Sequence, residues 1–399
     1  MGPNWFIELL RGIGKLFLQP LFYYAIILAI AVGISRVKRE RRHFRSSVYD
    51  FFHELRYLLT AGIGAGFCLS ILTVVSGHTL PTVFFIILTI STILLSINGS
   101  FRFLSPAFTI GLAFVLLFAI DQFPFDIPWL QQYLETVDET YLTGITILLG
   151  VLLIVEGVLM QQNGSKEVAP KLRRSRRGLV VGAFQGKRIW FIPILCFLPT
   201  GSLTPPFEWW PVIDWGANSY SLLLFPFVVG FQQQVQTTLP AGAIKRLGSY
   251  VRLLGVLVTA IAIVSIWIPM LTFVTVGVAI IGRVWISYRH RMRENAVPYF
   301  FTPKNNGLMV LDVIPNSPAY KMGLETGEVI VKCNNKRVFN LDELYQALQS
   351  NLTYCKLEVL DVNGQVRMAQ AALYEDDHHE LGILYVGEKG QRKWTEESS

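Results

Sequence analysis

Few residues in this 399-residue sequence have the type and spacing that catalysis requires. His378-His379-Glu380 supplies the start of HExxH, a pattern in which two histidines one helical turn apart bind zinc beside a glutamate base. The second histidine is missing, because Ile383 occupies its position. The C-terminal segment also lacks GxSxG, the pattern that presents a nucleophilic serine, and the four cysteines form no CxxC pair. We therefore predict no metal, no cofactor and no enzymatic activity.

Charged residues inside long apolar segments are the next candidates, since burying a charge in lipid is costly and such residues usually have a function. Glu156 lies near the end of an apolar segment and Arg102 lies in a short turn, so we expect both side chains to reach water. The run Gln232-Gln233-Gln234 could instead line a polar path between the broken helices of a transporter. With so few intramembrane charges, transport is a secondary hypothesis.

The amino-acid composition indicates the kind of domain that contains these residues. Hydrophobic residues make up 52% of the chain and charged residues only 16%, whereas soluble domains have about 25% charged residues. The apolar excess fills residues 16–288, and the remainder has an ordinary globular composition. We therefore predict a polytopic α-helical membrane domain over residues 1–290. The net charge of +7 comes from short loops between apolar runs, which argues against nucleic-acid binding.

A helix needs about 20 mainly apolar residues to cross the hydrocarbon core, and this length predicts about seven to nine transmembrane helices. Four of them are short and are interrupted or bounded by prolines. The predicted spans are 16–35, 57–77, 80–97, 104–120, 141–160, 189–203, 219–235, 251–268 and 270–288. Residues 4–18 are either part of an external N-terminus or an amphipathic helix that lies in the membrane interface.

Positively charged loops remain in the cytoplasm, and two loops, 36–56 and 161–188, are strongly basic. The acidic loop 121–140 and the tryptophan-rich loop 200–218 are expected outside. The run 251–288 then forms a helical hairpin that turns near Pro269, which places the C-terminal part in the cytoplasm. These basic loops are also candidates for binding anionic lipid or acidic partners. Their main basic residues are Arg36, Lys38, Arg39, Arg41, Arg42, Arg45, Arg173, Arg174, Arg176 and Arg177.

The soluble C-terminal part has the pattern of a small α+β domain. Residues 308–314 alternate as a strand, a short helix begins after Ser317, and Asn363-Gly364 predicts a hairpin turn. This order resembles the PDZ domains of bacterial membrane-associated proteins. The resemblance rests on Ser317, Pro318, Ala319, Gly323, Leu324, Gly327 and Glu328. It implies a linker at 291–299, a PDZ-like domain at 300–389 and a disordered tail at 390–399.

The PDZ resemblance also implies a peptide-binding groove. Its carboxylate-binding loop would be Leu381-Gly382-Ile383, and a helix that begins at Leu341 would flank it. A peptide would bind by β-augmentation, adding a strand to the sheet edge. Leu341, Leu344 and Leu348 share one helical face, which can equally be part of the hydrophobic core.

The whole chain is similar to the MinJ family, the polytopic PDZ proteins of the Min division-site selection system in Gram-positive rods. The similarity includes Trp5-Phe6-Ile7-Glu8-Leu9-Leu10, the basic loop followed by His53-Glu54-Leu55, and the stretch 103–111. It implies a scaffold of the cell membrane that bridges a DivIVA-like coiled-coil protein to MinD and MinC, among other divisome proteins, at septa and poles. A membrane-tethered protease component and a transporter with a regulatory PDZ domain remain as alternatives.

Overall fold

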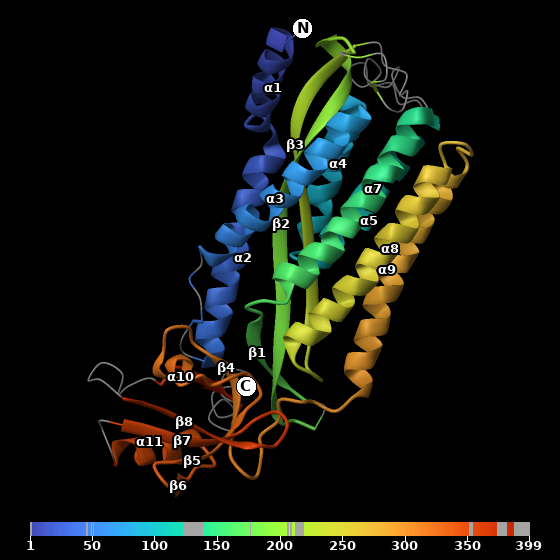
Figure 1. Cartoon of the computed structure of the whole chain (residues 1–399). Helices are drawn as coiled ribbons and strands as arrows, with labels where there is room; N and C mark the ends of the chain where they lie inside the picture. Colours follow the sequence, from blue (N-terminus) through green and yellow to red (C-terminus); the bar gives the residue numbers. More distant parts are fainter. Residues whose placement is uncertain are drawn as a thin grey trace.

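The computed structural model describes residues 2–44, 47–48, 50, 52–122, 139–175, 177–205, 207, 210–211, 219–350, 354–372 and 381–386. Five helices in these ranges are long and apolar enough to cross a membrane, and two shorter apolar helices lie among them (Figure 1). The five are α2 (Pro20–Phe44), α3 (His53–Ser76), α7 (Glu139–Leu159), α8 (Pro240–Val264) and α9 (Leu271–Ala296), and the shorter pair is α4 (Thr82–Ser96) and α5 (Pro106–Gln122). The expected count of seven to nine transmembrane helices is therefore not confirmed.

The predicted helical spans 189–203 and 219–235 are wrong, because both segments are β-strands. Strands β2 (Val180–Leu203) and β3 (Tyr220–Val235) form a long antiparallel hairpin, and β1 (Ala169–Arg174) pairs with the start of β2. The hairpin is buried on both faces, so its sequence is a continuous apolar run that periodicity cannot distinguish from a helix. The prolines that seemed to interrupt helices, Pro193 and Pro226, lie opposite each other in the strand register.

Helix α3 covers the outer edge of β2 at the depth of the membrane. This cover is required, since an open sheet edge facing lipid would leave backbone groups without hydrogen bonds. A Cβ atom at Gly62 or Gly66 would collide with the carbonyl oxygen of Phe191 or Pro193, so these glycines permit the close approach. One turn further, hydroxyls bond to the strand: Ser70 Oγ accepts from Leu195 N at 2.9 Å, and Thr73 Oγ1 donates to Leu195 O at 2.6 Å.

The outer edge of β3 is covered by the N-terminal helix α1 (Gly2–Leu16) and by the short 3-10 helix η1 (Phe101–Leu104). Lys15 Nζ donates to Leu222 O at 3.1 Å, and Phe101 N donates to Gln232 Oε1 at 3.1 Å. The predicted amphipathic segment 4–18 therefore forms a helix, and that helix packs on the hairpin (Figure 1).

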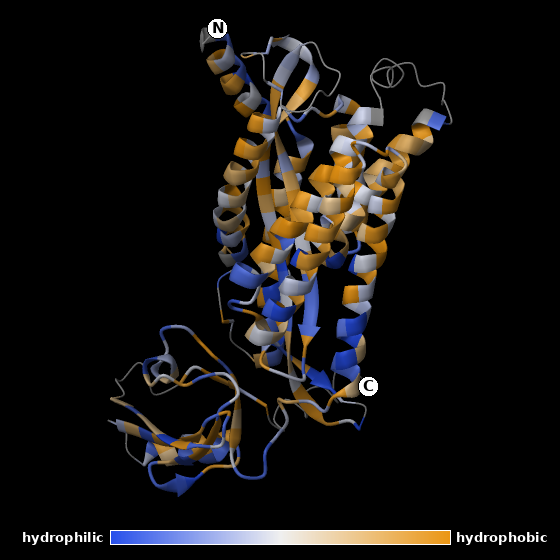
Figure 2. Cartoon of the chain, turned by 45° about the vertical axis from the view of Figure 1, so that its right-hand side comes forward, coloured by the Kyte–Doolittle hydropathy of each residue, from blue (hydrophilic) through white to orange (hydrophobic). Residues whose placement is uncertain are grey.

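The two basic loops meet at one end of the membrane domain, where hydrophilic residues gather (Figure 2). Arg39 Nη1 donates to Gln185 Oε1 at 2.8 Å, and Leu172 N donates to His43 Nδ1 at 3.3 Å. At the opposite end, α8 and α9 are joined by a turn at residues 265–270, so the predicted helical hairpin near Pro269 is confirmed.

The C-terminal domain is a sheet with the strand order β8-β7-β5-β4-β9, and β6 pairs with β5. Its elements are β4 (Leu308–Val313), α10 (Pro318–Lys321), β5 (Val329–Cys333), β6 (Lys336–Arg337), α11 (Leu341–Gln349), β7 (Tyr354–Leu360), β8 (Val366–Ala372) and β9 (Ile383–Tyr385). The turn between β7 and β8 contains Asn363-Gly364, as expected from the sequence. Helix α11 packs on the sheet and closes a hydrophobic core of its own.

Candidate functional site

The PDZ motif residues surround the short helix α10 and the turn that follows it. Ser317 is the N-cap, and its hydroxyl accepts a hydrogen bond from Tyr320 N at 3.3 Å. Ala319 is buried, and Gly323 has a φ of 70°, the left-handed conformation expected at a helix end. Pro318 and Leu324 are buried beside it, and Gly327 has a φ of 96°. The buried Glu328 forms an ion pair with Arg367 at 2.6 Å.

The segment predicted as the carboxylate-binding loop lies at the free edge of the sheet. Gly382 has a φ of 77°, and a Cβ atom there would collide with Ser317. The carbonyl groups of Leu381 and Gly382 accept hydrogen bonds from Ala319 N and Ile314 N, at 3.0 Å and 2.8 Å. No acceptor in the described ranges takes the N–H of Leu381 or Gly382. The sheet edge therefore offers the backbone N–H groups of Leu381 and Gly382 as donors, beside a turn that two hydrogen bonds hold in place.

The structure brings the predicted helix face and the predicted loop together. Leu344, Leu348 and Leu381 are buried in the core of the PDZ domain. Leu341 and Ile383 are only partly buried and pack against that core from α11 and from β9. The first three residues therefore support the fold, and the last two are the side chains of the predicted set that remain partly accessible.

The PDZ domain packs directly against the membrane domain. Gly182 N donates to Phe301 O at 2.8 Å, and the rings of Phe184 and Phe301 meet edge to face at 5.1 Å. Leu311 of β4 is fully buried in the same hydrophobic cluster. A Cβ atom at Gly182 would crowd the side chains of Phe301 and Leu311, so a glycine is needed for this close contact.

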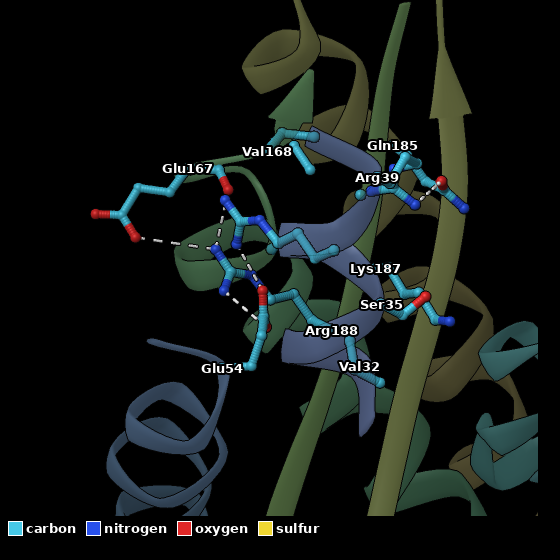
Figure 3. A pocket seen from close by; sticks show the side chains of 13 residues that line it. Val32, Ser35, Arg39, Glu54, Glu167, Val168, Gln185, Lys187 and Arg188 are labelled. Atoms are coloured by element: carbon cyan, nitrogen blue, oxygen red, sulfur yellow. Dashed lines mark hydrogen bonds and ion pairs between the residues drawn. The ribbon is translucent and has the colours of Figure 1, made fainter. Parts of the chain in front are cut away.

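A buried network of charges lies next to this interface, between α2, α3 and β2 (Figure 3). Arg36 contacts Glu40 at 2.9 Å and Glu54 at 2.6 Å, and Glu54 also pairs with Arg188 at 3.1 Å. Arg188 donates further to the backbone of Lys166 and Glu167. The carboxylate of Glu167 also lies 3.9 Å from Arg188. The two arginines therefore join three acidic residues, from α2, α3 and the segment before β1, and fix the basic end of the domain. Arg36, which was expected to be a loop charge, is buried in this network, and nothing near it in the sequence indicates Arg188.

The other predicted basic residues are divided between internal contacts and the surface. Arg39 bonds to Gln185, and Arg173 donates to Gln236 Oε1 at 3.2 Å. Lys38, Arg41, Arg42, Arg174 and Arg177 are exposed. Arg45, Arg176 and the pair His378-His379 with Glu380 lie outside the described residues.

A second charged pair lies within the helices. Glu156 of α7 and Arg283 of α9 are both fully buried and are 2.8 Å apart. Ser105 donates to the same carboxylate, and Ser287 accepts from the guanidinium at 2.8 Å. The expectation that Glu156 reaches water is therefore wrong, because a partner 127 residues away satisfies its charge inside the bundle.

The glutamine run lines a polar pocket of about 430 Å³ at the basic end of the domain. The pocket lies beside η1, β3 and α9, and Arg102, Arg173 and Arg291 line it together with the three glutamines. The run therefore does face a polar space.

The fold defines a class of protein: a polytopic membrane protein with a C-terminal PDZ domain. The PDZ domain family matches residues 309–356. No solved structure matches the chain.

The chain belongs to the MinJ family. It is 34% identical over 387 residues to the cell division topological determinant MinJ of Bacillus subtilis strain 168, a match that covers 97% of each chain. It is 24% identical over 380 residues to proteins named probable cell division topological determinant MinJ in Lacticaseibacillus paracasei and Lacticaseibacillus casei strain BD-II. These matches cover 92% of this chain and 95% of each relative.

Proposed function

We propose that the protein is a non-enzymatic membrane scaffold for division-site selection, which bridges a DivIVA-like coiled-coil protein to MinD and MinC. The family membership supports this role, since the relatives are named cell division topological determinants and the similarity covers both the membrane domain and the PDZ domain. A scaffold needs binding surfaces and a fixed location, and no turnover.

The open edge of β9 is the observation that carries the binding part of this proposal. A peptide strand beside β9 would accept hydrogen bonds from the backbone N–H groups of Leu381 and Gly382, and its side chains would contact Leu341 and Ile383. This is β-augmentation, in which backbone bonds give affinity and the flanking pockets give specificity. The turn at Gly382 is held by hydrogen bonds from Ile314 N and Ala319 N, so little ordering is needed on binding.

The shared position of the PDZ domain and the two basic loops supports a cytoplasmic location for all three, by the positive-inside rule. Exposed residues such as Arg41 and Arg177 then face the cytoplasm and can contact acidic partners or anionic lipid. Because the membrane confines the protein to two dimensions, several weak contacts to one partner add through effective concentration.

Localisation of a fluorescent fusion in living rod-shaped cells tests the scaffold role. We expect foci at septa and poles that disperse when the DivIVA-like protein is deleted, and loss of MinD and MinC from those sites when this protein is deleted. Uniform membrane fluorescence that is indifferent to the DivIVA-like protein would rule out the bridging role and direct attention to transport or proteolysis assays.

The groove has its own test, in the same cells. Ile383→Arg places a charge in the proposed peptide site, and we expect it to abolish recruitment of the PDZ-dependent partner while the fusion stays in the membrane. Val366→Arg is the matched control, because Val366 is 60% exposed on the strand β8 at the opposite edge of the sheet. Equal recruitment by both variants would show that the β9 edge binds no partner.

A further inference from the structure

A large apolar groove separates α8 and α9 at the end of the membrane domain that carries the PDZ domain. It has a volume of about 1460 Å³, and Figure 1 shows the two helices diverging toward Pro240 and Ala296. The helices touch at its inner end, where a Cβ atom at Gly282 would crowd Leu254.

The outer walls of this groove are apolar and exposed. Leu253 is 68% exposed, Leu257 52% and Trp285 60%, and all three line the groove. Both helices belong to the candidate membrane spans, so we expect this surface to face acyl chains. An amphiphile from the bilayer can therefore enter sideways.

Three arginines lie together at the mouth of the groove. Arg289 and Arg293 are one helical turn apart on α9, and Arg246 lines the same groove from α8. All three are exposed, and none has an ion pair or a side-chain hydrogen bond in the described part of the chain. The acidic residue that lines the groove, Glu294, is buried and its carboxylate accepts bonds from Gln236 N, Thr237 N and Thr237 Oγ1.

We propose that this groove binds an anionic phospholipid from the leaflet adjoining the PDZ domain. Its acyl chains would lie along Leu253, Leu257 and Trp285, and its phosphate would be bound by Arg246, Arg289 and Arg293. Basic pockets between membrane helices are suited to such headgroups, since the arginines supply charge and forked donors while the walls replace lipid contacts. A soluble anion would use the arginines alone and leave the apolar walls unexplained.

The same lipid would contact the PDZ domain. Val362, in the turn between β7 and β8, lines the groove together with Phe300, in the segment that enters the PDZ domain. Occupancy of the groove would therefore add contacts at the junction of the two domains. These added contacts between the lipid and the domain junction do not depend on which division protein the PDZ domain binds.

The test uses the full-length protein in nanodiscs, with bound lipids counted by native mass spectrometry. We expect retained phosphatidylglycerol in preference to phosphatidylcholine. Arg289→Gln with Arg293→Gln should weaken that binding by roughly tenfold or more, from the loss of two charges near the lipid surface. The control is Lys245→Gln with Arg291→Gln, which also removes two positive charges, one from α8 and one from α9, at residues outside the groove lining.

A second variant tests the apolar part without changing any charge. Ala260 lines the groove and is exposed, so Ala260→Trp fills the space with little strain and should also reduce phosphatidylglycerol retention. Inorganic phosphate is added as a competitor: no displacement is expected, and full displacement would show an anion site with no lipid specificity. Equal retention by the arginine variant and its control would overturn the proposal.

Discussion

Ser70 Oγ of α3 lies 2.9 Å from the backbone N of Leu195 in β2 and accepts its hydrogen bond. The contact joins a membrane helix to a strand edge that would otherwise hold an unpaired donor at the depth of the bilayer. Such a group costs several kcal/mol in hydrocarbon. Side-chain hydroxyls of α3 therefore satisfy the backbone groups at the edge of β2, as a neighbouring strand does in a larger sheet.

Ser70→Ala should destabilise the membrane domain by about 1–3 kcal/mol, because the Leu195 N–H loses its acceptor while remaining buried. Thermal unfolding in detergent would measure the change. Ser76→Ala is the control, since among the described residues the Ser76 hydroxyl bonds only to Thr73 O, within its own helix. An equal loss in both variants would contradict the edge-capping role.

Gly62→Ala should separate α3 from β2, because the new Cβ atom would collide with the backbone carbonyl of Phe191. Overpacking of this kind costs about 1–3 kcal/mol or more, and limited proteolysis should show faster cleavage of the membrane domain. Gly64→Ala on the same helix meets nothing within 4 Å. It should leave stability equal or slightly higher, so a loss there would point to a general intolerance of alanine.

Glu156→Gln should cost about 3–5 kcal/mol, since it leaves the Arg283 guanidinium buried without a charge partner. The double variant Glu156→Leu with Arg283→Leu removes both charges and should recover much of that loss. The half-buried pair of Lys332 and Glu358, which water still reaches, provides the comparison: Glu358→Gln should change stability by less than about 1 kcal/mol. A double variant no better than Glu156→Gln would contradict the ion-pair explanation.

Docking of the PDZ domain should weaken as pH rises from about 4 to 7. Burial, with the carboxylate of Glu40 nearby, raises the pKa of Asp312 to about 7. The folded state therefore holds a proton on Asp312 that the unfolded chain releases at lower pH. The free energy of unfolding falls across this pH range and levels off above it. Asp312→Asn should abolish this dependence, which hydrogen exchange of β4 at pH 5.5 and 8 would measure. If the pH dependence of hydrogen exchange were unchanged in Asp312→Asn, a group other than Asp312 would be responsible for it.

Much of the PDZ domain can be predicted from its sequence, because its signals are local. Ser317 marks the start of α10, Gly323 its end, and Asn363-Gly364 the turn between two strands; each depends on neighbours only a few residues away. The long helices α2, α3, α7, α8 and α9 are equally predictable, since length and apolar composition suffice for a membrane span.

The hairpin and the buried charges could not be predicted in the same way, because they depend on distant partners. A strand buried on both faces has the same apolar run as a short span. The residues that cover its edge are far away in the sequence, as Ser70, 125 residues before Leu195, illustrates. Glu156 near the end of a helix is typical of a residue that reaches water, and nothing close to it in sequence indicates Arg283.

The order of the elements along the chain has a consequence for how the protein is made. Both covers of the hairpin, α1 with η1 for β3 and α3 for β2, precede the two strands in sequence. As the ribosome synthesises the N-terminal part first, the surfaces that accept the strand edges are already in the bilayer when residues 180–235 emerge. Biogenesis can therefore proceed without a stage in which bare strand edges face lipid.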